Sequence, residues 1–336
     1  MHDSPETARR EVGADHSTPD FLGLADLAAA RVGGRALEAS DDFFAPKANL
    51  LKPGPAIFIP GKYTSKGKWM DGWESRRKRT PGHDWCVVQL GMRGIIRGVD
   101  VDTSFFTGNF PSHCSIEARD GRSGWTTVLD KVELRGDGHN YFRVTDDRPW
   151  THLRLNIFPD GGVARLRVHG DVVVDWSQLA RGGRSVDLAA ISNGGLVLAV
   201  SDMHYGAKDN MLMPGRAKNM GDGWETRRRR GPGFDWAIVR LGTAGTINRI
   251  EIDTNHFKGN YPDSASIEGC LAPAATLTAL DRAGWVEVLP QTKLRAHHRH
   301  LFAKELVHRG PVSHLRLNIF PDGGVSRLRV HGLPAR

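Results

Sequence analysis

The chain contains the same long motifs twice, which constrains it to fold as two copies of one unit. Three pairs of segments match within its 336 residues. By residue number they are 71–85 and 222–236, 102–111 and 253–262, and 152–170 and 314–332. The last pair differs at one position, where Ala164 becomes Ser326. A repeat of roughly 150 residues is far longer than a solenoid unit, so each copy is expected to be a domain with its own core.

The spacing between matching residues locates the loops and the domain boundaries. Gly33 and Gly194 are 161 residues apart, whereas Asp71 and Asp222 are 151 apart. The first copy therefore has ten extra residues, the difference between these spacings, which we place in a loop around 52–66. The predicted organisation is a disordered tail (1–20), a first repeat (21–172), a linker (173–187) and a second repeat (188–333).

Apolar and polar residues alternate within each copy, which predicts strands. In segment 153–158 every second residue is apolar, and a Pro-Asp-Gly-Gly turn follows at 159–162. We therefore expect 153–158 to form a hairpin with 163–168, and a short helix only at 22–30. Short strands separated by many turns favour an all-β fold, namely two tandem antiparallel β-sandwiches related by internal duplication.

The formal net charge of +8 is compatible with nucleic acid, a membrane surface or a small anionic substrate as partner. The basic residues gather in two runs, 76–79 and 227–230, and Pro-Gly follows each run closely. Neither run resembles a flexible basic tail, and the aromatic residues form no stacking pattern for single strands. No apolar run approaches the roughly 18 residues of a membrane span. These features argue against nucleic acid and a membrane as partners, whereas the basic residues fit either a small anionic substrate or a solvated strand face that carries arginine.

The three cysteines, Cys86, Cys114 and Cys270, are an odd number without a CxxC pair. This pattern argues against a closed disulfide framework and against a thiolate zinc site. A reduced, cytoplasmic location is the expectation that follows.

The duplicated motifs DGWE(S/T)RR(K/R)R with DW, DTxxFxGN(F/Y)P and LRLNIFPDGGxxRLRVHG resemble the allantoicase family. The resemblance covers nearly the whole chain, from about residue 20 to 332. It implies galactose-binding-like jelly rolls and the hydrolysis of allantoate to (S)-ureidoglycolate and urea, a step of allantoin and purine breakdown. It also implies a possible homo-oligomer.

That reaction needs an acid for the leaving nitrogen, a base for water and a cation for the substrate carboxylate. Glu74 and Glu225 are the candidate acids or bases, with ion pairing to neighbouring arginines as the alternative. The candidate carboxylate-binding cations are Arg76, Arg77, Arg227 and Arg228.

Further candidates lie in the DTxxFxGN motif. Asp253 is a candidate catalytic group and Asp102 a candidate substrate ligand, although either could cap its loop. Asn109 and Asn260 are candidate substrate ligands, or residues of a left-handed turn.

The two copies differ within this motif. His256 and Lys258 stand where the first copy has Phe105 and Thr107. His256 is therefore the best candidate for a general base, with an ordinary surface or packing histidine as the alternative, and Lys258 is the candidate for an added cation at the substrate. No HExxH or clustered His and Asp pattern occurs, so neither a metal site nor a cofactor is predicted. A weakly held divalent metal remains compatible with the sequence.

Two other functions fit parts of the pattern. A non-catalytic tandem carbohydrate- or ligand-binding module would use the same fold, because fold alone does not fix function. A nucleic-acid binder would use the two arginine runs and would bind with a steep dependence on salt.

Overall fold

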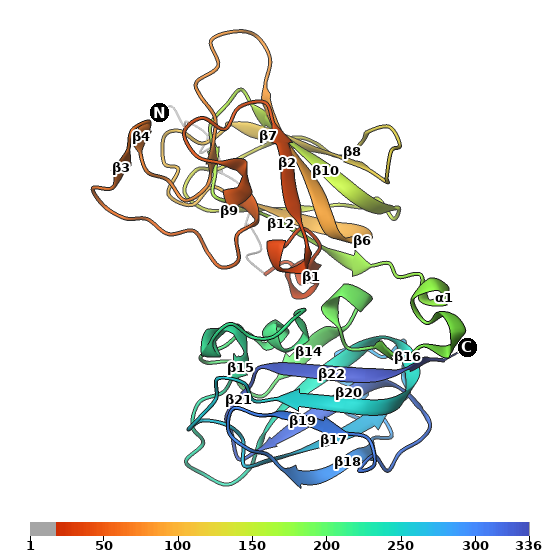
Figure 1. The fold of residues 1–336 in the computed structure, drawn as a ribbon. Helices are drawn as coiled ribbons and strands as arrows, with labels where there is room; N and C mark the ends of the chain where they lie inside the picture. Colours follow the sequence, from red (N-terminus) through yellow and green to blue (C-terminus); the bar gives the residue numbers. More distant parts are fainter. Residues whose placement is uncertain (1–17, 336) are drawn as a thin grey trace, which may run out of the picture.

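The computed structural model describes residues 18–335, which form two β-sandwich domains stacked one above the other (Figure 1). The first domain contains η1 (Asp20–Gly23), β1 (Ala25–Asp26), η2 (Ala30–Val32), β2 (Arg35–Ala39), η3 (Lys47–Leu51), β3 (Tyr63–Thr64), β4 (Gly67–Lys68), β5 (Trp73–Glu74), β6 (Asp84–Asp102), β7 (His113–Arg119), β8 (Thr126–Glu133), β9 (His139–Arg143), β10 (Pro149–Phe158), β11 (Gly162–Val163) and β12 (Arg165–Val172). The short helices α1 (Trp176–Leu179) and η4 (Arg181–Gly183) connect the domains.

The second domain repeats the order of the main strands. It contains β13 (Val186–Asp187), η5 (Ile191–Asn193), β14 (Leu196–Val200), η6 (Lys208–Leu212), η7 (Met220–Asp222), β15 (Trp224–Glu225), β16 (Asp235–Asp253), β17 (Ser264–Cys270), α2 (Leu277–Leu280), β18 (Val286–Lys293), β19 (Arg299–Phe302), β20 (Pro311–Phe320), β21 (Gly324–Val325) and β22 (Arg327–Pro334). The strand orders, β1-β12-β6-β10-β7-β8 and β13-β22-β16-β20-β17-β18, are equivalent. The predicted fold class, two tandem antiparallel sandwiches, is confirmed.

One long strand belongs to both layers of each sandwich. In the first domain, β10 pairs with residues 84–89 and 94–95 of β6, β2 pairs with residues 86–89, and β12 pairs within residues 94–102. Strand β9 pairs with the other edge of residues 98–102. The alternation in the sequence buries Leu153, Leu155 and Ile157 completely, as predicted from their shared face.

The expected hairpin of 153–158 with 163–168 is wrong. Strands β10 and β12 do not pair with each other but lie on opposite sides of β6. Between them, Gly162 and Val163 pair with β5, which takes the chain from one layer to the other. The helix expected at 22–30 is also wrong, because β1 occupies its middle and pairs with β12.

The predicted boundaries fall as follows. Residues 1–17 of the predicted tail lie outside the described residues, and Asp20 begins η1. The last two residues of the predicted linker form β13, which pairs with β22 as an edge strand of the second domain. The ten extra residues of the first copy lie in the loop that contains the β3–β4 pair.

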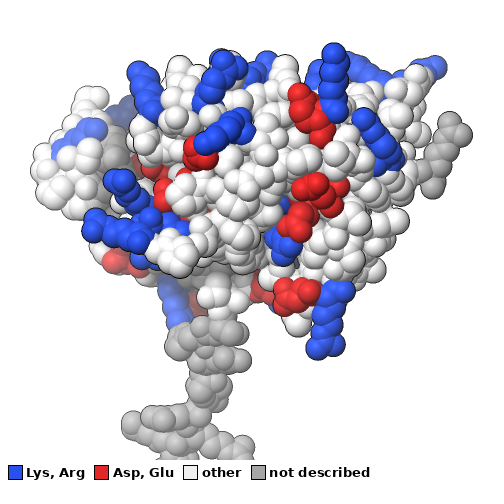
Figure 2. All heavy atoms as spheres, turned by 90° about the horizontal axis from the view of Figure 1, so that it is seen from below, with Lys and Arg blue, Asp and Glu red and all other residues white. Residues whose placement is uncertain are grey.

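The domains meet through η2 of the first and through the segment around η6 and η7 of the second. Arg31 Nη1 donates to Asn210 Oδ1 at 2.6 Å, and Arg31 Nη2 pairs with Asp222. No helix among residues 18–335 is both long enough and apolar enough to span a bilayer. On the face shown in Figure 2, Lys and Arg lie in separate groups with Asp and Glu between them.

Candidate functional site

The same carboxylate–amide pair is present in both domains. In the first, Asn109 Nδ2 donates to Glu74 Oε1 at 2.6 Å. In the second, Asn260 Nδ2 donates to Glu225 Oε1. The structure thus brings together four predicted site residues in two equivalent pairs.

Short strand pairings position each glutamate. Glu225 on β15 lies opposite Gly324 of β21, and Gly324 N donates to Asn260 O at 2.8 Å. Phe257 packs directly on Gly324, where an added Cβ would lie 2.1 Å from the ring. Glycine is therefore required at this position. Because Gly324 contacts both β15 and the 253–262 loop, it fixes Glu225 and Asn260 relative to each other.

Burial favours the protonated form of both glutamates. Glu225 is only 8 % exposed, and this burial raises its pKa, while the Asn260 hydrogen bond lowers it by a smaller amount. Burial also raises the pKa of Glu74, and the Asn109 hydrogen bond and the charge of Lys68 offset only part of the rise. A raised pKa extends the protonated form of a carboxyl group to higher pH, and only that form can act as an acid.

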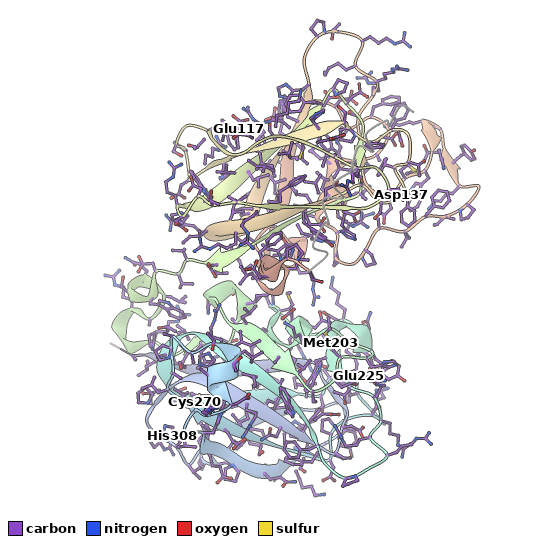
Figure 3. All side chains as sticks on the ribbon, turned by 180° about the vertical axis from the view of Figure 1, so that it is seen from behind. Glu117, Asp137, Met203, Glu225, Cys270 and His308 are labelled. Atoms are coloured by element: carbon purple, nitrogen blue, oxygen red, sulfur yellow. The ribbon has the colours of Figure 1, made fainter. Side chains whose placement is uncertain are left out.

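Each pair lies in a surface pocket, but the pocket walls differ. The pocket around Glu74 has a volume of about 360 Å³ and is lined by Phe44, Gly67, Lys68, Met70, Phe105, Thr107, Gly108 and Asn109. The pocket around Glu225 has a volume of about 520 Å³ and is lined by Tyr205, Thr226, Arg228, Arg229, Gly259, Asn260, Tyr261, Asp263, Pro321, Asp322 and Gly323. The second pocket is therefore the more polar and carries arginine. Figure 3 shows Glu225 beside the loop that carries Met203, and Tyr205 N of this loop donates to Glu225 O at 3.2 Å.

The arginine runs alternate between paired and open side chains. Arg76 Nε donates to Asp41 Oδ2 at 2.7 Å, and Arg227 Nη2 donates to Asp202 Oδ1 at 3.1 Å. The next residues, Arg77 and Arg228, are exposed, and no hydrogen bond or ion pair of their side chains occurs within 18–335. Of these four predicted substrate ligands, only Arg228 lines a pocket with a glutamate.

Asp102 and Asp253 cap their loops. Asp102 Oδ1 accepts from Ser104 N at 2.8 Å, and Asp253 Oδ1 accepts from Asn255 N at 2.9 Å. Both carboxylates are buried, and Asp253 Oδ2 also contacts Arg216 at 3.5 Å. Neither aspartate lines the pocket of its domain's glutamate.

His256 contacts the segment that contains Ala217. Its Nε2 hydrogen-bonds to Ala217 O at 2.9 Å, so this nitrogen carries the proton and Nδ1 keeps the lone pair in the neutral ring. Its backbone has a φ of 72°, like that of Phe105 at 69°. His256 and Lys258 do not line the pocket around Glu225. Lys258 is exposed.

Sequence analysis missed the aspartates that hold the arginine runs. Asp41 and Asp202 lie far from these runs along the chain but are 161 residues apart, the spacing of Gly33 and Gly194. This shared spacing was the available signal. No group of three or more His, Cys, Asp or Glu side chains that could hold a metal ion occurs in the described part of the chain.

Comparisons with known proteins agree with the duplicated architecture. A family model described as "Allantoicase repeat" matches the chain twice, over residues 25–173 and 186–335. "Probable allantoicase 1" of Burkholderia mallei is 53% identical over 329 residues, which cover 95% of this chain and 97% of that protein. "Probable allantoicase" of Pseudomonas paraeruginosa is 51% identical over 332 residues, which cover 96% and 99%.

The fold has also been seen in a solved relative. The crystal structure of allantoicase from Saccharomyces cerevisiae matches with a TM-score of 0.78 and 36% identity, and covers 92% of both chains. The family model matches both repeats, the relatives are about 50% identical over almost their full length, and the fold is shared. The chain therefore belongs to the allantoicase family.

Proposed function

We propose that the chain hydrolyses allantoate to (S)-ureidoglycolate and urea in the pocket around Glu225. The observation that carries this proposal is the buried Glu225–Asn260 pair, in which burial favours a protonated carboxyl group. Release of urea requires a proton on the leaving nitrogen, and Glu225 is a suitable donor.

In the protonated form of Glu225 the proton is placed on Oε2, because Asn260 donates its hydrogen bond to Oε1. The bond between the central carbon and one ureido nitrogen breaks, its electron pair goes to nitrogen, and the Oε2 proton completes urea. The lone pair of the other ureido nitrogen stabilises the central carbon. Water then adds through oxygen, and its proton returns to Oε2. One water is consumed and Glu225 regains its starting state.

Arg228 is the proposed ligand of the substrate carboxylate. It lines the same pocket, and its side chain makes no ion pair within the described residues. A guanidinium group binds a carboxylate through two parallel hydrogen bonds. The pocket around Glu74 has Lys68 and several apolar side chains instead, so we propose it as a second, divergent site. His256 as general base, Asp253 as catalytic group, and Asp102, Arg77 and Lys258 as substrate ligands stay predictions.

The test is to incubate purified protein with allantoate and to measure urea and ureidoglycolate, with and without a chelator. The Glu225→Gln and Glu74→Gln variants are matched, because each removes the proton donor but keeps the Asn hydrogen bond. We expect urea release in the unmodified protein and its near loss in Glu225→Gln. Binding of allantoate without any urea release would favour the ligand-binding module.

We further propose a cytoplasmic location and assembly into a homo-oligomer. Cys86, Cys114 and Cys270 are free and buried, which suits a reducing compartment. The oligomer rests on the family resemblance alone. Cell fractionation tests the cytoplasmic location, and recovery of the protein from an oxidising compartment would contradict it. Light scattering tests the second, with a mass of one chain as the contrary result.

A further inference from the structure

The cleft between the two domains is rich in basic side chains. It has a volume of about 430 Å³ and is lined by Ala30, Arg31, Pro53, Pro214, Arg216, Lys218, Asn219, Gly221, Asp222 and Arg327. Four of these side chains are cationic and one is acidic. A cleft of this size accommodates a small ligand, and such a charge imbalance favours an anion.

The existing ion pairs leave two of the cations open. Asp222 pairs with both Arg31 and Arg327, so its charge is already shared. Arg216 makes one long contact, to Asp253 at 3.5 Å, and its side chain is 63% exposed. The Lys218 side chain is exposed and makes no ion pair within residues 18–335. Arg216 and Lys218 can therefore bind a ligand without losing a strong partner.

These two cations are absent from the same framework in the first domain. Arg165 Nε donates to Gly54 O, as Arg327 Nε donates to Gly215 O. Pro55 follows Gly54, whereas Arg216 follows Gly215.

The position of Lys218 also has a clear equivalent. Ile57 N donates to Asp71 Oδ2 at 3.2 Å, as Lys218 N donates to Asp222 Oδ2 at 3.0 Å. The first domain thus shows that this backbone forms without either cation. Arg216 and Lys218 are therefore not needed for the folding of the second-domain loop that carries them.

The predicted catalytic loop holds this segment in place. Ala217, between the two cations, is buried, and its carbonyl oxygen accepts from His256 Nε2 at 2.9 Å and from Asn255 Nδ2 at 3.3 Å. The residues on both sides of Ala217 line the cleft. The cations are thus presented by a fixed backbone, which reduces the entropy lost on binding.

We propose that this cleft binds a small oxyanion, a carboxylate or a phosphate, through Arg216, Lys218 and the side of Arg31 that lines the cleft. This ligand site is separate from the pocket around Glu225 and does not depend on the proposed hydrolysis. A bound anion contacts both domains and stabilises their arrangement.

The test is calorimetric titration of the full-length protein, at low ionic strength, with malonate and with inorganic phosphate. The variant Arg216→Pro/Lys218→Ile places the first-domain residues on the second-domain framework. Each lost charged hydrogen bond weakens binding by about tenfold or more. We expect at least that loss for the anion that binds, and the comparison of malonate with phosphate identifies its class.

Arg228→Ala is the matched control, because it removes an open arginine from the other pocket. Binding that persists in Arg228→Ala supports the cleft site. Binding that is lost in Arg228→Ala, or that is unchanged in the double variant, overturns it, as does the absence of binding of both anions to the unmodified protein. If the proline variant does not fold, Arg216→Gln/Lys218→Gln provides the same comparison. Titration with these probes is independent of turnover, so a failure here is distinct from a failure to hydrolyse allantoate.

Discussion

Arg31 of the first domain pairs with Asp222 of the second in the way that Lys52 pairs with Asp71 inside the first domain. The position equivalent to Lys52 is Met213, at the 161-residue spacing, which cannot form an ion pair. One oxygen of Asp222 is therefore open to a cation from the other domain. The ion pair between the two domains thus depends on the presence of Met213 where the first domain has Lys52.

Replacing Arg31 with Met should weaken the coupling of the two domains. We expect the free energy of unfolding to fall by about 1–3 kcal/mol, because a part-buried charged hydrogen bond is lost, and we expect calorimetry to resolve two transitions. Arg143→Met is the control, since it removes an exposed ion pair with Asp20 inside the first domain. A single, unshifted transition in Arg31→Met would show that the pair does not join the domains.

Glu225→Gln should lower turnover by about 100-fold or more, the range of a lost acid catalyst. Glu74→Gln should have a smaller effect, since the pocket around Glu74 lacks an open arginine. Steady-state kinetics on both variants, together with their melting temperatures, make the comparison. Equal losses in the two variants would assign the reaction to both domains.

The activity should also fall as the pH rises through the raised pKa of Glu225. An acid catalyst acts only in its protonated form, and burial extends that form to a pH above the ordinary range. The Asn260 hydrogen bond lowers this pKa, so Asn260→Ala should move the falling limb to higher pH. A profile of kcat/KM against pH for both proteins measures the shift, and a limb that moves to lower pH contradicts the assignment.

Arg228→Ala should raise KM by about tenfold or more, because a charged hydrogen bond to the substrate carboxylate is lost. Arg227→Ala is the adjacent control. Arg227 is already bound to Asp202, so its loss should leave KM nearly unchanged. If Arg227→Ala raised KM as much as Arg228→Ala did, the division into paired and open arginines would have no functional meaning.

His256→Ala should separate two roles for this residue. Its bond to Ala217 O leads us to expect a positioning role, with turnover reduced by less than about tenfold and anion binding in the cleft weakened. A loss of about 100-fold in turnover with unchanged thermal stability would instead make His256 the general base that its place in the motif predicts. Phe105→Ala, at the equivalent position of the first domain, is the control in both measurements.

The sequence predicted the duplicated all-β fold class better than it predicted the pairing of strands. Repeated motifs and the alternation of apolar and polar residues can both be recognised from the order of residues along the chain. Alternation says which residues face the core but not which strand lies alongside. That is why 153–158 and 163–168 looked like a hairpin, although the long strand β6 separates them.

The candidate site shows the same division. Glu225 and Asn260 belong to motifs present in both copies, and the structure brings them together. Whether an arginine of the run is ion-paired or open could not be predicted from the run itself, because Asp202, the partner of Arg227, lies in another segment. The open cations of the cleft could not be found from the repeats, since Arg31 and Lys218 have no cationic equivalents at the matching positions, Ser192 and Ile57.

Within residues 18–335, every strand pairing joins two segments of the same domain. An ancestor with a single domain could therefore fold unaided before its gene was copied. Because both copies hold the Glu–Asn pair at equivalent positions, we infer that the ancestral domain already had it. Fusion in one chain then fixed the ratio of the two pockets at one to one, so that either could change while the other kept the original chemistry.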